Sequence, residues 1–154
     1  MERKSRYHDG VERDLLSRLR DRGWRLSPQR RVVAEVLAGE HVHLSAEDVH
    51  ARAQERLPEI SRATVYNTLH ELVSMGEVLE LAVTDGPRRY DPNAQVEHDH
   101  LVCDRCHAVR DVPRTSRRTL SMTDADLAGY VVTGVDVVFR GVCPQCAGAG
   151  AEAR

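Results

Sequence analysis

The chain has 154 residues, 41% of them hydrophobic and 30% charged, with a formal net charge of −2. This length allows one large domain or two small ones, with apolar cores that need no disulfide support. No apolar stretch approaches the roughly 20 residues that span a bilayer, which argues against a membrane protein. The chain begins with a charged run and not with the apolar core of a signal peptide, so we expect a cytoplasmic protein.

Positive charge is concentrated near the N-terminus. Residues 13–31 carry seven arginines and only two aspartates, a local charge of +5 on a weakly acidic chain. Surfaces of this kind meet phosphate groups in nucleic-acid-binding proteins. A solvated helical face is the alternative for a charge run taken alone.

Apolar spacing and capping residues predict three helices before residue 58. The first covers residues 11–22 and ends at Gly23. The second begins after Ser27, with a proline at its first position, and ends at Gly39. The third begins with a capping box at Ser45 and reaches about residue 57.

A fourth helix is predicted over residues 62–75, capped by Ser61 and stopped by Gly76. Its apolar residues recur on one face, which we expect to be buried. These are Val65, Leu69 and Leu72. The pattern leaves four polar residues on the other faces: Arg62, Thr64, Asn67 and Thr68.

A β-hairpin is predicted next, because residues 78–83 and 88–91 flank a turn at Asp85-Gly86. Short helices followed by a hairpin with a basic second strand are typical of a winged helix-turn-helix, whose last helix enters the major groove of DNA. Near bases we expect Arg62, Thr64, Tyr66 and Asn67. At phosphates we expect Arg18, Arg25, Arg30, Arg88 and Arg89.

The second half of the chain changes to short β-type runs at residues 101–102, 108–112 and 130–139, with a helix predicted over 114–129. A small sheet with an exposed edge suits pairing with a second copy, so we expect a homodimer. The predicted class is α+β, a winged-helix domain followed by a small α/β dimerisation domain. Its predicted parts are a flexible arm at 1–10, a DNA-binding domain at 11–90, a hinge at 91–94, a dimerisation and metal-binding domain at 95–146 and a disordered tail at 147–154.

All four cysteines occur in two pairs, Cys103-x-x-Cys106 and Cys143-x-x-Cys146. Two such pairs supply the four thiolates of a closed tetrahedral site, so we predict structural zinc. Two disulfides are an alternative, which the expected reducing compartment argues against. A thioredoxin-like redox pair is another, but two pairs that contain every cysteine favour one shared metal.

A second metal site is suggested by the alternation at residues 97–100, which places His98 and His100 on one face of a strand. Asp91, Asp111 and His43 are candidates to complete it. Nitrogen and carboxylate ligands without thiolate suit Fe(II) or Mn(II). The alternative is that the two histidines are ordinary surface residues, since a histidine pair at a strand edge is as often that as a pair of metal ligands.

In order and spacing, these features resemble the ferric uptake regulator (Fur) family of metal-dependent repressors. The resemblance covers residues 15–146 and rests on four stretches: residues 23–30, residues 63–66, His98-x-His100-x-x-Cys103-x-x-Cys106, and residues 141–146. It implies a winged-helix domain, a hinge, and a dimerisation domain with zinc on the four cysteines. It also implies a regulatory metal between the domains and an inverted-repeat DNA operator.

The regulatory ligand types distinguish branches of that family. Zinc-sensing members usually place a cysteine where this chain has Asp91, and iron-sensing members commonly use glutamates where it has Asp91 and Asp111. The set His43, Asp91, His98, His100 and Asp111 is most similar to the peroxide-responsive (PerR-like) branch, in which Fe(II) and hydrogen peroxide oxidise a ligand histidine. By resemblance, His43 or His98 would be modified.

Other functions are weighed against this one. A zinc hydrolase or deaminase would need a metal position open to water, which four cysteines close, so we expect no enzyme and no small organic substrate. A zinc-ribbon interaction module would explain the cysteines but not the basic helices or the His/Asp set. Within the family, an iron-uptake repressor is the main alternative, ahead of a zinc or nickel sensor.

Overall fold

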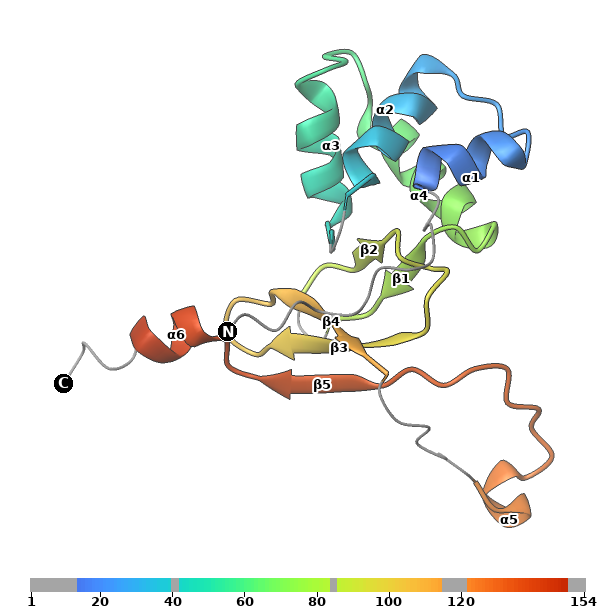
Figure 1. Cartoon of the computed structure of the whole chain (residues 1–154), viewed down its shortest axis with the longest axis vertical. Coiled ribbons are helices and arrows are strands. Elements are labelled where there is room, and N and C mark those ends of the chain that lie inside the picture. Colours follow the sequence, from blue (N-terminus) through green and yellow to red (C-terminus); the bar gives the residue numbers. More distant parts are fainter. Residues whose placement is uncertain (1–13, 40–41, 84–85, 115–121, 150–154) are drawn as a thin grey trace, which may run out of the picture. The chain divides into compact units, whose positions relative to one another are not determined.

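The computed structural model describes residues 14–39, 42–83, 86–114 and 122–149. They separate into two compact units, Met1–Ala82 with Pro87–Ala94, and Val83–Gly86 with Gln95–Arg154. The first unit holds helices α1 to α4 and the hairpin β1–β2, and the second holds a sheet of β3, β4 and β5 (Figure 1). None of the described helices is long and apolar enough to cross a membrane.

The four predicted helices of the first unit are confirmed. They are α1 (Leu15–Asp21), α2 (Pro28–Leu37), α3 (Ala46–Gln54) and α4 (Arg62–Ser74). Each begins with a side-chain oxygen that accepts the backbone N–H three residues further on; these caps are Asp14, Ser27, Ser45 and Ser61. The predicted start of the first helix at residues 11–13 lies outside the described residues, and α3 is three residues shorter than predicted.

The core of the first unit is built from one face of each helix. Its fully buried side chains include Leu19 of α1, Leu37 of α2, Val49 of α3 and Leu69 of α4. Thr68 is also buried, which corrects its predicted place on a polar face of α4. Its hydroxyl donates to the Thr64 carbonyl at 2.8 Å, so burial leaves this group hydrogen-bonded.

The predicted hairpin is present as β1 (Leu79–Leu81) and β2 (Arg89–Asp91). The strands are antiparallel, with Leu79 opposite Asp91 and Leu81 opposite Arg89. Gly76 ends α4 at φ 70°, a left-handed conformation that glycine adopts without a Cβ penalty. The first of the two predicted turn residues, Asp85, lies outside the described residues.

The second unit is a three-stranded sheet in the order β4-β3-β5 (Figure 1). Its strands are β3 (His98–Cys103), β4 (Val109–Pro113) and β5 (Val138–Gly141). β3 lies antiparallel to β4 and parallel to β5. The apolar side chains buried in the described part of this unit are few: Val83, Val102 and Cys103.

Three predictions for the second unit were wrong in extent. Residues 130–137 form no strand and are mostly exposed; the carbonyl of Val137, next to β5, accepts the His100 N–H of β3 at 3.3 Å. The predicted helix over 114–129 is reduced to α5 (Asp124–Leu127), with residues 115–121 outside the description. The predicted tail begins too early, since residues 147–149 complete α6 (Pro144–Ala149), which has proline at its first position.

Candidate metal centres and DNA-binding face

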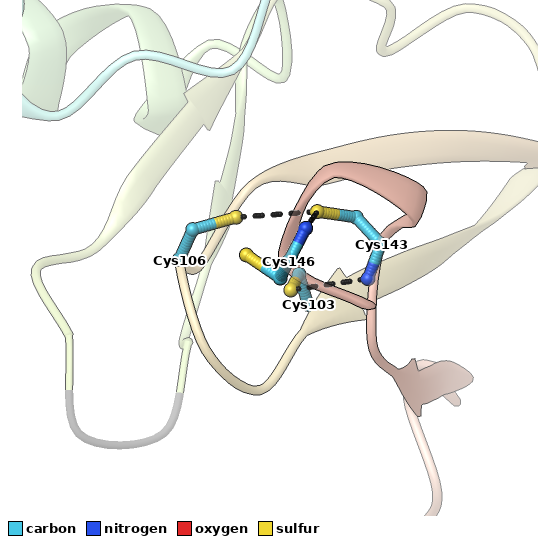
Figure 2. Close-up of side chains that lie close together, drawn as sticks. All are labelled: Cys103, Cys106, Cys143 and Cys146. Atoms are coloured by element: carbon cyan, nitrogen blue, oxygen red, sulfur yellow. Dashed lines mark hydrogen bonds between the residues drawn. The ribbon is translucent and has the colours of Figure 1, made fainter. Parts of the chain in front are cut away.

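The four cysteine side chains converge on one point in the second unit (Figure 2). Their sulfur atoms all lie within 4.8 Å of one another, and Cys106 Sγ is 3.7 Å from Cys143 Sγ. Sulfurs bound tetrahedrally at about 2.3 Å from zinc lie about 3.8 Å apart, which matches the latter distance. All four cysteines are free thiols. The donor set therefore fits a closed structural Zn(Cys)4 site.

Parallel pairing of β3 and β5 brings the two cysteine pairs together. The last pair in register is Cys103 opposite Gly141, so both cysteine loops leave the sheet at the same end. The Asp104 N–H donates to the Gly141 carbonyl at 2.8 Å, and Arg105 Nη1 donates to the Cys146 carbonyl at 2.7 Å. These bonds hold one loop against the other without help from a metal.

Backbone N–H groups also prepare the thiols as ligands. Hydrogen bonds from the backbone N–H groups of Cys106, Cys143 and Arg105 lower the pKa of Cys103 to about 6. The Cys143 N–H lies 3.3 Å from Cys103 Sγ. Neighbouring sulfurs, first Cys143 and then Cys106, raise the pKa of Cys146 to about 12. Metal binding must therefore displace a proton from Cys146, whereas Cys103 is already a thiolate at neutral pH.

A second cluster lies on one face of β3 and β4. His100 is directly opposite Asp111, and its Nε2 is 3.9 Å from Asp111 Oδ1. His98 Nε2 lies 3.6 Å from that oxygen and 3.0 Å from His100 Nε2. The Val96 carbonyl can only accept, so His98 Nδ1 donates to it at 2.7 Å. A neutral His98 therefore carries its lone pair on Nε2, as a metal ligand requires.

The other face of β3 carries the acidic half of the predicted alternation. Arg114 donates to Asp99 Oδ1 at 2.9 Å from Nη2 and at 3.1 Å from Nε, and its Nη1 reaches Glu97 at 3.3 Å. This confirms that the histidines and the acids of residues 97–100 lie on opposite faces.

The remaining two predicted ligands, His43 and Asp91, form a pair in the first unit. His43 Nε2 is 3.6 Å from Asp91 Oδ2, and both side chains are almost completely buried. Asp91 Oδ1 accepts the Asn93 N–H at 2.8 Å. Buried imidazole and carboxylate groups without a thiolate fit Fe(II) or Mn(II), as does the cluster on β3 and β4.

The exposed face of α4 is the candidate surface for reading bases. Arg62, Tyr66 and Asn67 are exposed, while Thr64 is half-buried and its hydroxyl lies 2.8 Å from that of Ser61. His70 is also exposed and follows Tyr66 by one helical turn, which agrees with its interpretation from the sequence as polar surface.

The five predicted phosphate-binding arginines differ in their surroundings. Arg25 and Arg88 are exposed, and Arg88 pairs with Glu80 at 2.9 Å. Arg30 pairs with Glu71 at 2.6 Å and stacks over the Trp24 ring at 4.9 Å. Arg89 pairs with Asp48 and is only 19% exposed.

Arg18 of α1 contacts residues before and after the hairpin and is largely buried. Its Nε lies 2.7 Å from Glu77 Oε2, and its Nη2 donates to the carbonyls of Glu77 and Pro92 at 3.2 and 3.0 Å. Arg22 pairs with the other Glu77 oxygen at 2.7 Å. These contacts assign Arg18 to the base of the hairpin. The sequence analysis missed Glu77, because no local pattern marks a glutamate between a helix and a strand as buried.

Comparisons with known proteins agree with this architecture. The ferric uptake regulator family matches residues 21–139. A ferric uptake regulation protein of Synechococcus elongatus is 34% identical over 137 residues, covering 86% of this chain and 92% of its own. The peroxide-responsive repressor PerR of Staphylococcus aureus is 28% identical over 141 residues, covering 90% and 95%. The crystal structure of the Campylobacter jejuni peroxide stress regulator aligns with a TM-score of 0.61 and 28% identity, covering 87% of this chain and all of that one.

The winged-helix unit and the metal-ligand clusters define a metal-dependent transcriptional regulator. The chain belongs to the ferric uptake regulator family, whose members are regulators and not enzymes.

Proposed function

We propose that this protein is a homodimeric repressor that binds inverted-repeat operators with Fe(II) or Mn(II) as corepressor, and that it senses hydrogen peroxide. The observation that carries this proposal is the pair of thiolate-free ligand clusters, His43 with Asp91, and His98 with His100 and Asp111. One ion held by ligands from both units would link the fold of one to that of the other. The chemistry of the bound ion supplies the signal.

The proposed DNA contacts are assigned by exposure. Arg62, Thr64, Tyr66 and Asn67 on α4 are proposed to meet base edges, and Arg25, Arg30 and Arg88 are proposed to meet phosphates. Two copies related by a two-fold axis would present two α4 helices to successive half-sites, which requires an inverted repeat.

Several exposed apolar side chains in the second unit support the proposed homodimer. Tyr130 and Val131 are 80% and 87% exposed, and Val132, Val135 and Val138 are also exposed. Exposed apolar side chains are expected to be covered where they gather into a patch, and such patches mark interaction sites. Residues 130–136 have the alternation of a strand but pair with no strand in the described part of the chain, so a second copy of the sheet is the proposed partner.

The peroxide response is proposed to occur at a ligand histidine, His43 or His98. One oxygen atom from hydrogen peroxide is added to the imidazole ring, the O–O bond breaks, and the second oxygen leaves as water. The modified ring is a poorer ligand, so the metal site is weakened and the operator is released. Mn(II) should support repression without this chemistry.

The test is DNA binding to the promoter of the protein's own gene, with zinc on the cysteines and Fe(II) or Mn(II) added separately, before and after sub-millimolar peroxide. We expect binding with either metal, and loss of binding after peroxide only with iron. Asp111→Asn should abolish metal-dependent binding, while Asp124→Asn, at an exposed aspartate of the same unit, should not. Absence of any metal-dependent binding by the wild type would refute the regulator proposed here.

Mass spectrometry tests the sensing step separately. After peroxide treatment of the iron-loaded protein, the peptide containing His43 or the one containing His98 should gain the mass of one oxygen atom. If neither does so, and iron-dependent binding survives peroxide, the protein is an iron-uptake repressor. The 34% identical Synechococcus elongatus ferric uptake regulation protein favours that second candidate.

A further inference from the structure

Two segments of the first unit lie side by side as a short ladder. Leu44, just before α3, is the antiparallel bridge partner of Tyr90 in β2, and the two residues exchange backbone hydrogen bonds of 3.3 and 2.8 Å. In an antiparallel pair the neighbouring positions also face each other. This register sets His43 across from Asp91 and Ser45 across from Arg89.

The two ends of the ladder have different chemistry. One end is the buried His43–Asp91 pair, with Nε2 and Oδ2 3.6 Å apart. At the other end Arg89 Nη1 donates to Asp48 Oδ2 at 3.1 Å. That same oxygen accepts the backbone N–H and the hydroxyl of Ser45 at 3.0 and 2.6 Å, closing the capping box of α3. The proposed ligand His43 therefore lies two residues before Ser45, the cap of α3.

The N-terminus of α3 also contacts the candidate DNA-reading face. The Tyr66 hydroxyl on α4 donates to Glu47 Oε1, in the first turn of α3, at 2.8 Å. Two side-chain contacts, Arg89 with Asp48 and Glu47 with Tyr66, are therefore joined through the backbone of β2, which carries Asp91 and Arg89, and through the first turn of α3, which carries Glu47 and Asp48. All of them lie within the first unit.

We propose that Arg89 is a positioning residue that couples the metal ligands of the first unit to α3 and, through Glu47, to Tyr66. This inference rests on the proposed metal-dependent repression. Metal bound by His43 and Asp91 would fix the ladder, and Arg89 would then hold the cap of α3 in the arrangement that sets Tyr66 for DNA. Arg89 acts inside the protein, which replaces the phosphate contact expected from its sequence position.

The neighbouring arginine shows why a phosphate contact is the weaker assignment. Arg88 is 65% exposed and pairs with Glu80, whereas Arg89 is 19% exposed and pairs with Asp48. The two assignments also predict opposite effects for Asp48. Removing a negative charge near bound DNA should strengthen binding, but removing the partner of a coupling arginine should weaken the metal response.

The experiment measures operator affinity of the full-length, zinc-loaded protein with and without Mn(II), across a series of salt concentrations. We expect Arg89→Gln and Asp48→Asn each to reduce the Mn(II)-dependent gain in affinity at least fivefold, and the double variant to reduce it no further. The salt dependence of operator affinity measured without Mn(II) should stay unchanged. Arg88→Gln is the matched control and should keep the wild-type gain.

Glu47→Gln guards against a folding defect, because this exposed carboxylate contributes only the last contact of the series. This substitution should also reduce the Mn(II)-dependent gain in operator affinity. It should leave unchanged the melting temperature of the zinc-loaded protein without Mn(II). Mn(II) affinity measured by calorimetry without DNA should change little in any of these variants.

Two results would overturn the coupling role. One is equal weakening of binding by Arg89→Gln with and without Mn(II), with the salt slope of the dimer reduced by about 1.8, or about 0.9 for each copy, which would make Arg89 a phosphate contact. The other is a Mn(II)-dependent gain in operator affinity that is as large in every variant as in the wild type. A wild-type protein with no Mn(II)-dependent gain would instead refute the proposed function itself, and the coupling with it.

Discussion

His107 has a backbone conformation that favours glycine. It follows the first cysteine pair with φ 57°, in the left-handed region that glycine adopts without strain. Its N–H donates to the Cys103 carbonyl at 2.9 Å, so the turn is needed to close the cysteine loop. Because a Cβ atom strains this conformation, a non-glycine residue here lowers the stability of the loop.

Replacing His107 by glycine should therefore stabilise the zinc-loaded protein. The left-handed conformation costs a non-glycine residue about 1–2 kcal/mol, and the greater freedom of glycine in the unfolded chain offsets part of that. We expect a gain of up to about 1 kcal/mol in the free energy of unfolding, measured with denaturant. A loss of stability would show that the His107 side chain makes a contribution larger than the strain.

The Cys103 thiol gives a pH-dependent prediction at the same scale. Backbone hydrogen bonds lower its pKa to about 6, so in the metal-free protein it should ionise as the pH rises through that value. The ultraviolet absorbance of thiolate should show this early step. Cys103→Ser should remove the step and Cys146→Ser should keep it; a first step near the ordinary thiol pKa would contradict the preorganised site.

At the scale of elements, one buried carboxylate joins the helices to the hairpin. Glu77, 1% exposed, lies between the end of α4 and β1 and pairs with Arg18 and Arg22 of α1 and its C-cap. The Arg22 guanidinium also donates to the Met75 carbonyl at 3.0 Å. The position of the hairpin relative to α1 depends on this ion-pair network.

Glu77→Gln should destabilise the first unit by about 2–3 kcal/mol, below the usual 3–5 kcal/mol for a fully buried pair because Arg22 is half exposed. The reason is that two guanidinium groups lose their counter-charge. Denaturant unfolding followed by the fluorescence of Trp24 measures this change. Glu80→Gln, which breaks the more exposed pair with Arg88, should cost less than about 1 kcal/mol.

Elements with local signals were predictable from the sequence. The four helices of the first unit carry a capping oxygen and an apolar period, and the histidine face of β3 follows from alternation alone. The cysteine cluster follows from spacing. What failed depends on distant partners: a strand over residues 130–137 needs a neighbour, and the role of Arg18 depends on Glu77, 59 residues away.

At the scale of the whole molecule, apolar burial is unequal between the two units. The main core cluster of the described residues lies entirely in the first unit. The second unit buries few apolar side chains and exposes several valines. A small domain with so little core usually needs a metal, a disulfide or a partner chain. Zinc and a second copy are the supports proposed here.

Removing zinc with a strong chelator should therefore destabilise the second unit and leave the first folded. Trp24 is the only tryptophan and lies in the first unit, so its fluorescence should change little. Amide hydrogen exchange should accelerate in β3 and β5 while α2 and α4 stay protected. Parallel loss of protection in both units would show that the first unit cannot fold alone.

The pairing of β3 with β5 also has a consequence for the order of events during synthesis. Cys143 follows Cys106 by 37 residues, so the metal cluster closes only after a long connecting segment has been made. The helices and the hairpin of the first unit pair mostly near neighbours, which favours rapid folding. As the chain leaves the ribosome, the first unit should be folded before the second can acquire its zinc. A cell short of zinc would accumulate molecules with a finished DNA-reading half and an unfinished second half.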